Sequence, residues 1–381
     1  MKTRPSDLLQ NRTELDQLRS VTPEDLLGRD EVSLDLSQIT QFFKSKTVLV
    51  TGAGGSIGSE LCRQISYYGA ECLVLYEQNE FNLYQIEQEL QDLFPGTQLV
   101  TVLGDVRDCD CLERVFAAWK PSVVYHAAAY KHVPMVEKNP FEGIRTNILG
   151  TRNVASLCVR YDVGNFVLVS TDKAVNPTNI MGATKRVAEM VVQRFSVLKS
   201  KTKFSIVRFG NVLGSSGSVI PLFKRQIEKG GPITLTHPEI ERYFMSIPEA
   251  TRLVIQASLI GEGGEVFVLD MGAPVKIIDL ARKMISLAGL REGRDIKIEI
   301  VGLRPGEKLF EELLADKETT KPTSIKKIKI AAARSVTETQ EKIIDALLDL
   351  ATADSVDVYR EELQRIVPEY VPAIRETESH V

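Results

Sequence analysis

The sequence predicts an α/β protein built on a doubly wound parallel sheet, with a smaller α/β region beside it. Three observations support this fold class. A short apolar run at 47–51 enters a cluster of glycines and then a helical pattern. Strand and helix patterns alternate from there to about residue 210, which is the order that gives parallel strands with helices on both faces. After Gly210, clusters of Gly, Ser and Pro over 211–247 predict a loop-rich region over the carboxyl edge of the sheet.

The expected elements follow the chain in order. Strands are predicted at 47–51, 72–76, 98–102, 122–126, 165–170 and 204–208, and helices at 57–69, 79–94, 108–119, 140–161 and 182–199. Shorter strands and helices are expected to about Arg334, and 337–366 has the pattern of two terminal helices. Residues 1–45 are polar and lack a core of their own. We expect this arm to bury Leu26 and Leu27 against the main body or against another subunit.

Length and composition limit the class of protein. The 381 residues are enough for one large domain or two ordinary ones, and 43% hydrophobic with 26% charged residues is typical of a soluble globular protein. The net charge of −4 predicts neither nucleic acid nor an anionic membrane surface as a partner. No apolar run approaches the roughly 18 residues of a membrane span, and 1–12 lack the apolar core of a signal peptide. Five cysteines favour a reduced cytoplasm.

The glycines after the first strand form the strongest local signal. Residues 47–58 read Thr-Val-Leu-Val-Thr-Gly-Ala-Gly-Gly-Ser-Ile-Gly. A strand, a glycine turn and a helix in this order are the context of a dinucleotide-binding fingerprint. Gly52 allows the tight turn, Gly55 lets the backbone approach a pyrophosphate, and Gly58 lets the helix pack against the strand. The N–H groups of the first helical turn, at Ser56, Ile57 and Gly58, are then expected to face the phosphates.

The second strand indicates which dinucleotide binds. It ends in Glu77, 19 residues after Gly58. An acid at this place accepts hydrogen bonds from the adenosine ribose hydroxyls and repels a 2′-phosphate. No Arg or Lys lies between Glu77 and Gln91. The expected cofactor is therefore NAD rather than NADP.

Ligands of such sheets bind outside the carboxyl ends of the strands, so other candidates follow strand ends. Asp105 and its neighbour Val106 follow the third strand, and Asp105 is placed to meet the adenine amino group or to serve as an ordinary loop acid. Ala127 and Ala128 follow the fourth strand and are small enough to lie against a cofactor. The string Tyr-Lys-His follows at 130–132. Lys131 and His132 are candidates to line the site, and His132 is alternatively the cap of a helix.

Cys109 and Cys111 form the one cysteine pair that suggests a metal. No second Cys or His pair follows at zinc-ligand spacing, so we predict no metal and interpret 108–111 as a loop entering a helix.

The fifth strand ends in Ser-Thr-Asp-Lys, 170–173, and Lys185 follows on the next helix. The glycine motif, the Ser/Thr after the fifth strand and this Lys resemble the extended short-chain dehydrogenase/reductase family, whose fold is a Rossmann sheet. That family has a Tyr four residues before the Lys, whereas this chain has Met181. The string Ser-Thr-Asp-Lys-Ala-Val-Asn-Pro-Thr-Asn, 170–179, resembles the nucleotide-sugar 4,6-dehydratases that act on UDP-N-acetylglucosamine in polysaccharide biosynthesis. Met in place of Tyr resembles the members that retain the C5 configuration.

The resemblance covers about 26–312 and implies where a UDP-sugar binds. The stretch 208–218, from Arg208 to Ser218, matches the segment over the nucleotide diphosphate, and Arg242 and Arg304 match diphosphate and ribose contacts. Arginine binds a pyrophosphate through paired hydrogen bonds. The substrate-binding residues that follow from these matches are Lys131, His132, Asn211, Ser218, Arg242, Arg304 and Glu307.

A 4,6-dehydratase needs groups for three protons, at the C4 hydroxyl, C5 and the C6 oxygen. Lys173 is expected to take the C5 proton if burial or nearby Lys185 lowers its pKa. Asp172 is expected to protonate the leaving hydroxyl, and Thr171 to bond the C4 oxygen. Without a Tyr, the C4 proton goes either to Asp172 or to a water relayed through Thr171 and Lys185, and the sequence does not decide between them.

Two other functions stay open on the sequence. One is a C5-inverting dehydratase or a 4-epimerase, whose relatives keep the Tyr that Met181 replaces. The other is a non-catalytic NAD-binding protein. The expected organisation is an arm at 1–45, an NAD-binding domain at 46–210, a mainly nucleotide-sugar-binding region at 211–334 with segments that return to the sheet, and a helical tail at 335–381. We expect a cytoplasmic homo-oligomer, either complete or the soluble part of a membrane-anchored protein.

Overall fold

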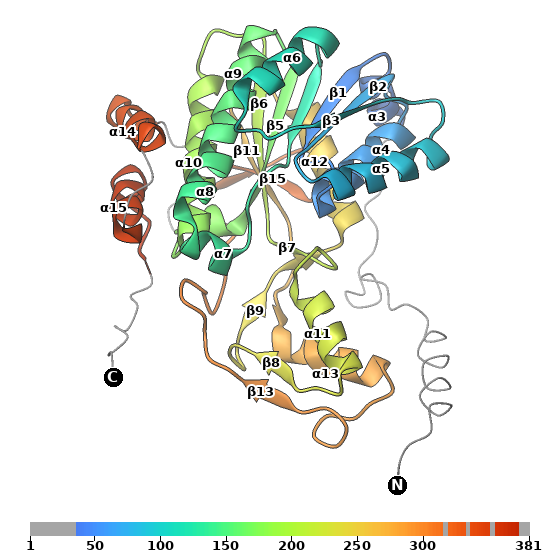
Figure 1. Cartoon of the computed structure of the whole chain (residues 1–381), viewed down its shortest axis with the longest axis vertical. Helices are drawn as coiled ribbons and strands as arrows, with labels where there is room; N and C mark the ends of the chain where they lie inside the picture. Colours follow the sequence, from blue (N-terminus) through green and yellow to red (C-terminus); the bar gives the residue numbers. More distant parts are fainter. Residues whose placement is uncertain (1–35, 315–318, 333–335, 351–354, 373–381) are drawn as a thin grey trace.

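The structure is a computed structural model that describes residues 36–314, 319–332, 336–350 and 355–372. Its centre is a nine-stranded sheet with the order β14-β15-β11-β6-β5-β4-β1-β2-β3 (Figure 1). The strands are β1 Thr47–Thr51, β2 Cys72–Glu77, β3 Gln98–Leu103, β4 Val123–His126, β5 Asn165–Thr171, β6 Lys203–Phe209, β11 Val266–Leu269, β14 Thr320–Pro322 and β15 Ile328–Ala331. The six strands predicted from the sequence are confirmed to within a residue at each end.

The sheet is parallel from β3 to β11 and ends in two antiparallel strands. β15 runs antiparallel to β11, and β14 runs antiparallel to β15. The order 3-2-1-4-5-6 reverses beside β1, where Thr51 lies opposite both Tyr76 of β2 and His126 of β4. Such a reversal opens a crevice at the carboxyl ends of the strands. The glycine turn follows β1 directly and therefore lies at this crevice.

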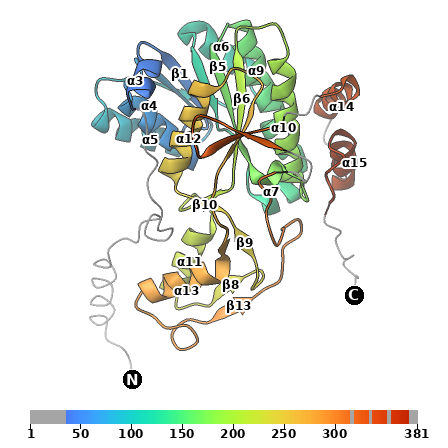
Figure 2. The same cartoon turned by 180° about the vertical axis from the view of Figure 1, so that it is seen from behind.

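Helices cover both faces of the sheet, so the predicted doubly wound architecture is confirmed (Figures 1 and 2). One apolar cluster joins the sheet to α3, α4, α5 and α12, and the other joins it to α6, α9 and α10. The helices and turns of this body are α3 Leu36–Phe43, α4 Ser56–Tyr67, α5 Glu80–Leu93, α6 Cys109–Trp119, α7 Val133–Lys138, α8 Pro140–Ile144, η1 Arg145–Leu149, α9 Gly150–Arg160, η2 Asp172–Ala174, α10 Ile180–Ser196 and α12 Ile247–Ile260.

One continuous helix was expected over 140–161, and this expectation is wrong: the stretch is helical but interrupted. The stretch is divided by the π-helical turn η1 between α8 and α9. A π turn inserts a residue into the helical repeat and redirects side chains. Here it places Asn147, which is almost fully buried, so that its amide bonds both the N–H and the C=O of Tyr130.

Beyond the carboxyl edge lies a smaller region with its own apolar core (Figure 1). Its elements are β7 Asn211–Val212, α11 Val219–Glu228, β8 Ile233–Leu235, β9 Glu241–Arg242, β10 Phe244–Met245, β12 Val275–Lys276, α13 Ile277–Leu287 and β13 Ile298–Ile300. The chain enters this region twice, after β6 and after β11, and returns to the sheet with α12 and β11 the first time and with β14 the second. Both excursions begin at the carboxyl ends of parallel strands, so the smaller region lies beside the crevice that the sheet opens.

The two predicted terminal helices are confirmed as α14 Glu338–Asp349 and α15 Val356–Ile366. They pack on α10 in an apolar cluster that includes Met181. Arg186 of α10 is ion-paired with Glu369 at 3.2 Å, and the N–H of Val371 donates to the Pro177 carbonyl at 3.1 Å. The C-terminal segment thus holds the helix and the loop that follow the fifth strand.

The N-terminal arm is described only from residue 36. Leu26 and Leu27 lie outside the described residues. Ile39 and Phe43 of α3 are buried in the main core, and the ring of Phe43 stacks on Tyr68 with centroids 6.4 Å apart. Across the described ranges, no helix combines the length and the apolar character that a membrane crossing requires.

Candidate functional site

The glycine turn has the geometry of a phosphate-binding loop. Gly52 has φ of +68°, and a Cβ there would lie 2.8 Å from Ala128 Cα. A Cβ on Gly58 would lie 1.9 Å from the Gly52 carbonyl oxygen, so both glycines are required by the packing of the protein itself. Gly55 differs, because a Cβ there would meet only the Gly52 oxygen, at 3.3 Å. The space in front of Gly55 is open, and no side chain caps the first turn of α4.

A cavity of about 150 Å³ lies beside this turn, at the ends of β1, β2 and β4. Six of the predicted cofactor residues line it: Gly52, Gly55, Glu77, Val106, Ala127 and Ala128. Ser56, Ile57, Gly58, Asp105 and Lys185 do not line it. Ser56 instead accepts a hydrogen bond from the backbone N–H of Ser216 at 3.1 Å, which joins the glycine turn to the loop before α11.

Glu77 is buried at the end of β2, and its two oxygens bond backbone N–H groups. One oxygen accepts from Gly54 at 3.0 Å and the other from Asn79 at 3.0 Å. The carboxylate therefore holds the glycine turn in place and also presents its charge to the cavity. The sequence predicted the second role and missed the first.

The side chain of Asp105 is bound to its neighbour Arg107. Its carboxylate accepts hydrogen bonds from the backbone N–H of Arg107 at 2.9 Å and from the Arg107 Nε at 2.7 Å. Burial alone would raise the pKa of Asp105, but the bonds from Arg107 outweigh it and lower that pKa. Arg107 therefore orients the carboxylate, and both alternatives for Asp105, the adenine contact and the ordinary loop acid, stay predictions, because each oxygen can accept a second hydrogen bond.

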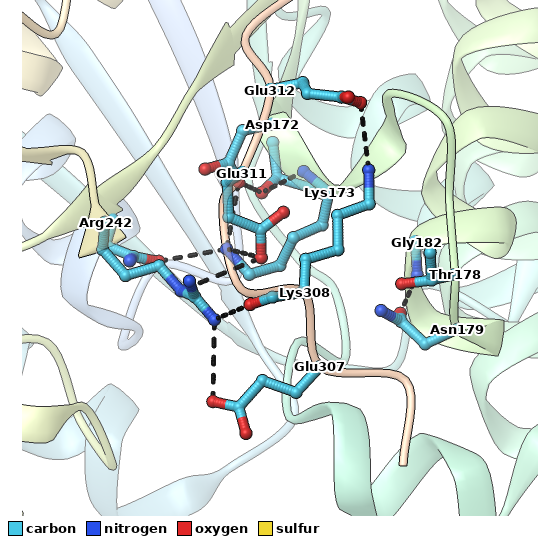
Figure 3. A network of polar contacts seen from close by, with 12 residues as sticks. Asp172, Lys173, Thr178, Asn179, Gly182, Arg242, Glu307, Lys308, Glu311 and Glu312 are labelled. Carbon is cyan, nitrogen blue, oxygen red and sulfur yellow. Dashed lines mark hydrogen bonds and ion pairs between the residues drawn. The ribbon is translucent and has the colours of Figure 1, made fainter. Parts of the chain in front are cut away.

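The end of β5 holds a buried acid beside a lysine (Figure 3). Asp172 is fully buried, and its Oδ1 accepts from Thr171 Oγ1 at 2.9 Å and from Lys173 Nζ at 3.0 Å. Its Oδ2 is buried without a hydrogen-bond partner in the described chain. Lys173 Nζ also donates to Asn211 Oδ1 at 3.0 Å. The structure therefore brings Thr171, Asp172 and Lys173 together, and it adds Asn211, which the sequence analysis had placed with the substrate residues.

The condition that the sequence analysis attached to Lys173, a lowered pKa, is not met in the free protein. Burial does lower it, but the carboxylates of Asp172 and Glu311 outweigh burial, and the pKa of Lys173 is raised. The positive charge of Lys173 also acts on Lys131: burial is the larger cause that lowers the pKa of Lys131, and the charge of Lys173 is the second. In this arrangement Lys173 is an ammonium group.

Lys185 and Met181 lie on α10 below this cluster. Lys185 is buried, and its Nζ donates to the Val169 carbonyl at 2.8 Å. Burial lowers the pKa of Lys185 to about 8, with Glu189 opposing the change. Met181 is buried in the apolar cluster under the terminal helices and offers no group that titrates. Lys185 is thus the group on this helix that can exchange a proton near neutral pH.

Predicted substrate residues gather where the smaller region meets the sheet. The His132 ring lies against Gly217, since a Cβ on that glycine would be 2.5 Å from its Cε1. His132 occupies the N-cap position of α7, but its side chain makes no capping hydrogen bond. The Oγ of Ser218, at the start of α11, is buried without a partner among the residues described.

Arg242, an expected contact of the nucleotide, and Arg208, the first residue of the matched segment 208–218, both bind other parts of the protein. Arg208 is buried and ion-paired with Glu189 at 2.7 Å. Arg242 is also buried and donates to the carbonyl oxygens of three residues, Glu241, Lys308 and Leu309, at 2.7–3.1 Å. Its guanidinium therefore secures the chain segment that follows β13.

That segment, 301–314, carries two predicted residues and one that the sequence did not indicate. Arg304 is exposed, and its backbone N–H donates to Glu307 at 3.1 Å. Glu307 lies 3.6 Å from Arg242. Glu311, which no spacing or motif singled out, is buried 3.9 Å from Lys173 Nζ (Figure 3).

No metal centre is evident in the described part of the chain, where no three His, Cys, Asp or Glu side chains gather as metal ligands. Cys109 begins α6, as the interpretation of 108–111 expects.

Comparisons with known proteins agree with this fold. The family model described as "Polysaccharide biosynthesis protein" matches residues 48–333. The chain is 56% identical over 313 residues to the capsular polysaccharide biosynthesis protein CapD of Staphylococcus aureus, a match that covers 82% of this chain and 52% of CapD. It is 34% identical over 282 residues to UDP-N-acetylglucosamine 4,6-dehydratase (inverting) of Campylobacter jejuni, covering 73% of this chain and 80% of that enzyme. The chain spans about half the length of the first curated relatives it matches.

Two solved structures illustrate the likeness of fold. Pen from Bacillus thuringiensis has a TM-score of 0.71 and 33% identity, and the match covers 82% of this chain and 100% of Pen. UDP-glucose 4-epimerase from Thermus thermophilus, solved as a complex with NAD, has a TM-score of 0.59 and 22% identity, covering 68% of this chain and 88% of that one. Because the family model matches about three quarters of the sequence, the chain belongs to the polysaccharide biosynthesis protein family.

Proposed function

We propose that the chain is an NAD-dependent nucleotide-sugar 4,6-dehydratase that acts on UDP-N-acetylglucosamine, retains the C5 configuration, and serves the synthesis of a surface polysaccharide. The family and the 34% identity to a UDP-N-acetylglucosamine 4,6-dehydratase support the class of reaction. Met181, in the place of the usual Tyr, supports retention at C5.

The glycine turn supports NAD as the cofactor. The open space before Gly55, the uncapped first turn of α4 and the carboxylate of Glu77 suit a pyrophosphate and a ribose with free hydroxyls. When bound, NAD supplies a reversible hydride acceptor, which allows a C4 ketone to form and the neighbouring C5 hydrogen to become acidic. The preference for NAD over NADP follows from Glu77, whose charge repels a 2′-phosphate.

The single observation that carries the proposal is the buried Asp172–Lys173 pair at the end of β5. The pair combines a carboxylate that has one oxygen unpartnered among the described residues with an ammonium group 3.0 Å away. An unpartnered buried acceptor costs about 1–3 kcal/mol, and a hydroxyl of a bound sugar would remove that cost. The same pair holds the one proton that elimination across C5 and C6 has to move.

The proton chemistry begins with the ion pair. In our proposal, the sugar displaces water from the pair, and the proton crosses from Lys173 Nζ to Asp172, because a low dielectric favours the neutral acid and amine. The Lys173 amine then accepts the C5 hydrogen as a proton, and Asp172 donates its proton to the C6 oxygen, which leaves as water. Both groups return to their starting charges at the end of this exchange.

The proton of the C4 hydroxyl has two candidate acceptors. One is Asp172, which would then deliver this proton, instead of one from Lys173, to the C6 oxygen, with Lys173 entering the cycle as the neutral amine. The other is a water that connects Thr171 with Lys185. The pKa of Lys185, lowered by burial to about 8, suits the second route. The Thr171 hydroxyl donates to Asp172 at 2.9 Å, so it can accept from the C4 oxygen while remaining oriented.

We assign the UDP part of the substrate to the place where the smaller region meets the sheet. In our proposal, Lys131, His132, Asn211 and Ser218 bind it there, and Arg304 lies exposed on segment 301–314. Arg242 and Glu307 act on the substrate through the position of that segment, because Arg242 already donates to its carbonyls.

The test is to incubate the purified protein with UDP-N-acetylglucosamine and follow the sugar by proton NMR. A 4-keto product with a C6 methyl signal and unchanged C5 configuration is expected. An inverted C5 would favour the inverting dehydratase, and UDP-N-acetylgalactosamine would favour the 4-epimerase. NAD binding without any conversion would leave a non-catalytic NAD-binding protein and would refute the proposal.

A further inference from the structure

Glu311 lies in the Asp172–Lys173 cluster although its segment crosses from the smaller region. Its side chain is 5% exposed, and its Oε1 lies 3.9 Å from Lys173 Nζ and 3.9 Å from Arg242 Nε. Its Oε2 is buried and accepts no hydrogen bond from the described residues. Figure 3 shows the carboxyl group between the ends of the Lys173 and Arg242 side chains.

Glu311 is not needed to anchor this segment. Arg242 holds the carbonyls of Lys308 and Leu309, and the side chains of Thr178 and Asn179 both donate to the Gly306 carbonyl, at 2.9 and 3.0 Å. Burying a carboxylate with one unpartnered oxygen costs free energy of folding. Without a close hydrogen bond, the carboxylate acts on its neighbours mainly through its negative charge. Two cations lie at equal distances from that charge, the ammonium of Lys173 and the guanidinium of Arg242.

We propose that Glu311 is a positioning residue that sets the protonation state of Lys173. This deepens the proposed function, because it assigns a control of the group that exchanges the C5 proton. Lys173 faces two carboxylates, Asp172 at 3.0 Å and Glu311 at 3.9 Å. The second carboxylate stabilises the ammonium form and opposes transfer of the proton to Asp172 until the substrate has displaced water.

The charges around the cluster agree with this role. The positive charges of Arg242, from β9, and of Lys131, from the loop after β4, oppose a positive charge on Lys173. Lys308 also lies near Glu311, and its charge acts to lower the pKa of that carboxyl group. Against them, Asp172 and Glu311 keep the pKa of Lys173 raised. Burial raises the pKa of Glu311, with Lys173 opposing the change. The proton balance of Lys173 therefore depends on whether Glu311 is charged.

The test measures Lys173 directly. Wild-type protein is labelled with a trace of an isotopic acylating reagent across a pH series, and mass spectrometry of the peptide that contains Lys173 gives the pH at which the amine becomes reactive. Glu311→Gln removes the charge and keeps the shape. Glu312→Gln is the matched control, because Glu312 is the next residue and bonds Lys308 and Asn176 instead of Lys173.

The wild-type inflection is expected above the ordinary lysine value of about 10.4. In Glu311→Gln it is expected to fall by about one to three pH units, the usual effect of an opposite charge at this distance. In Glu312→Gln it is expected to stay at the wild-type value. A wild-type inflection at or below the ordinary value, or an unchanged inflection in Glu311→Gln, would overturn the proposal. If Glu311→Gln does not fold, Glu311→Asp is expected to give an intermediate inflection, and the wild-type value still decides.

The activity arm separates this inference from the proposed function. With UDP-N-acetylglucosamine as substrate, kcat is measured as a function of pH. The inflection of this profile that arises from titration of Lys173 is expected at lower pH in Glu311→Gln than in wild-type protein. KM should change by less than about twofold, because a positioning residue acts through Lys173 and leaves the sugar contacts in place. Absence of product from wild-type protein would refute the dehydratase while the labelling result still stands. A kcat profile that keeps its inflection despite a shifted labelling inflection of Lys173 would show that Glu311 does not act through Lys173 in turnover.

Discussion

Glu189 of α10 and Arg208 of β6 form a two-point ion pair in the interior of the protein. The Nε of Arg208 lies 2.8 Å from one carboxylate oxygen of Glu189, and a terminal nitrogen lies 2.7 Å from the other. Ser170, just before the Asp172–Lys173 pair, donates to the same carboxylate at 2.7 Å, and Arg186 lies 3.1 Å away. This pair joins α10 to the strand ends that carry the site.

Glu189→Gln is expected to lower the free energy of unfolding by about 3–5 kcal/mol, because it removes the carboxylate charge that is paired with the buried guanidinium of Arg208. Urea unfolding followed by circular dichroism measures the change. Glu338→Gln is the control: Glu338 pairs with Lys342 at the surface, and its loss should cost less than about 1 kcal/mol. Equal stability of both variants would show that the buried pair does not fasten α10 to the sheet.

The same carboxylate predicts a dependence on acid. Burial would raise the pKa of Glu189, but Arg208, Arg186 and Ser170 lower it to about 2. A depressed folded pKa gives stability that is complete above the unfolded value of about 4.3 and disappears as the pH falls towards 2. The melting temperature of wild-type protein should therefore fall over this window, and the fall should be shallower in Glu189→Gln.

Glu77→Ala is expected to weaken the binding of NAD by about 1–3 kcal/mol and to reduce the ratio of the affinities for NAD and NADP. The reason is twofold, since the carboxylate faces the cavity and also holds the Gly54 N–H of the glycine turn. Binding titrations with both cofactors measure the change. Equal affinity of wild-type protein for NAD and NADP would refute the role assigned to Glu77.

Asp172→Asn and Lys173→Met are each expected to reduce turnover by about 10²–10⁴, the usual worth of a positioned acid or base. NAD binding should survive in both, because neither residue touches the glycine turn. Without Lys173, reduced-cofactor absorbance should accumulate without product, and solvent deuterium should not enter C5. Near-normal activity of both variants would remove the proposed mechanism.

Met181→Tyr tests the position where the family has its Tyr. Met181 is buried among apolar side chains, so the larger ring is expected to cost about 1–3 kcal/mol of stability. If the new hydroxyl rescues Asp172→Asn, the C4 proton belongs to Asp172. Failure to rescue, in a double variant that still binds NAD, would favour the water between Thr171 and Lys185.

The sequence predicted the local features well because they have local causes. The glycine turn, the strand at 47–51 and the pairing of Asp172 with Lys173 each follow from adjacent residues. The π turn at Arg145–Leu149 was missed because its apolar spacing resembles that of an uninterrupted helix.

The electrostatic part of the site could not be predicted, because it depends on distant segments. The raised pKa of Lys173 requires Glu311, which lies 138 residues further along the chain. Arg242 matched a ligand-binding motif, yet the structure shows its donors used by backbone carbonyls. Motif matching identified some of the charged residues of this cluster, and only the fold shows which charges lie next to one another.

The contacts of Arg186 with Glu369 and of Val371 with Pro177 also have a consequence for synthesis on the ribosome. The nine strands of the sheet have been translated once Ala331 is added, but α14 and α15, which cover part of the apolar surface of α10, follow later. At 5–20 residues per second, translation from Ala331 to Val371 takes about 2–8 s. For that time the nascent chain exposes the part of α10 that these two helices cover, and this surface is where we expect a chaperone to bind.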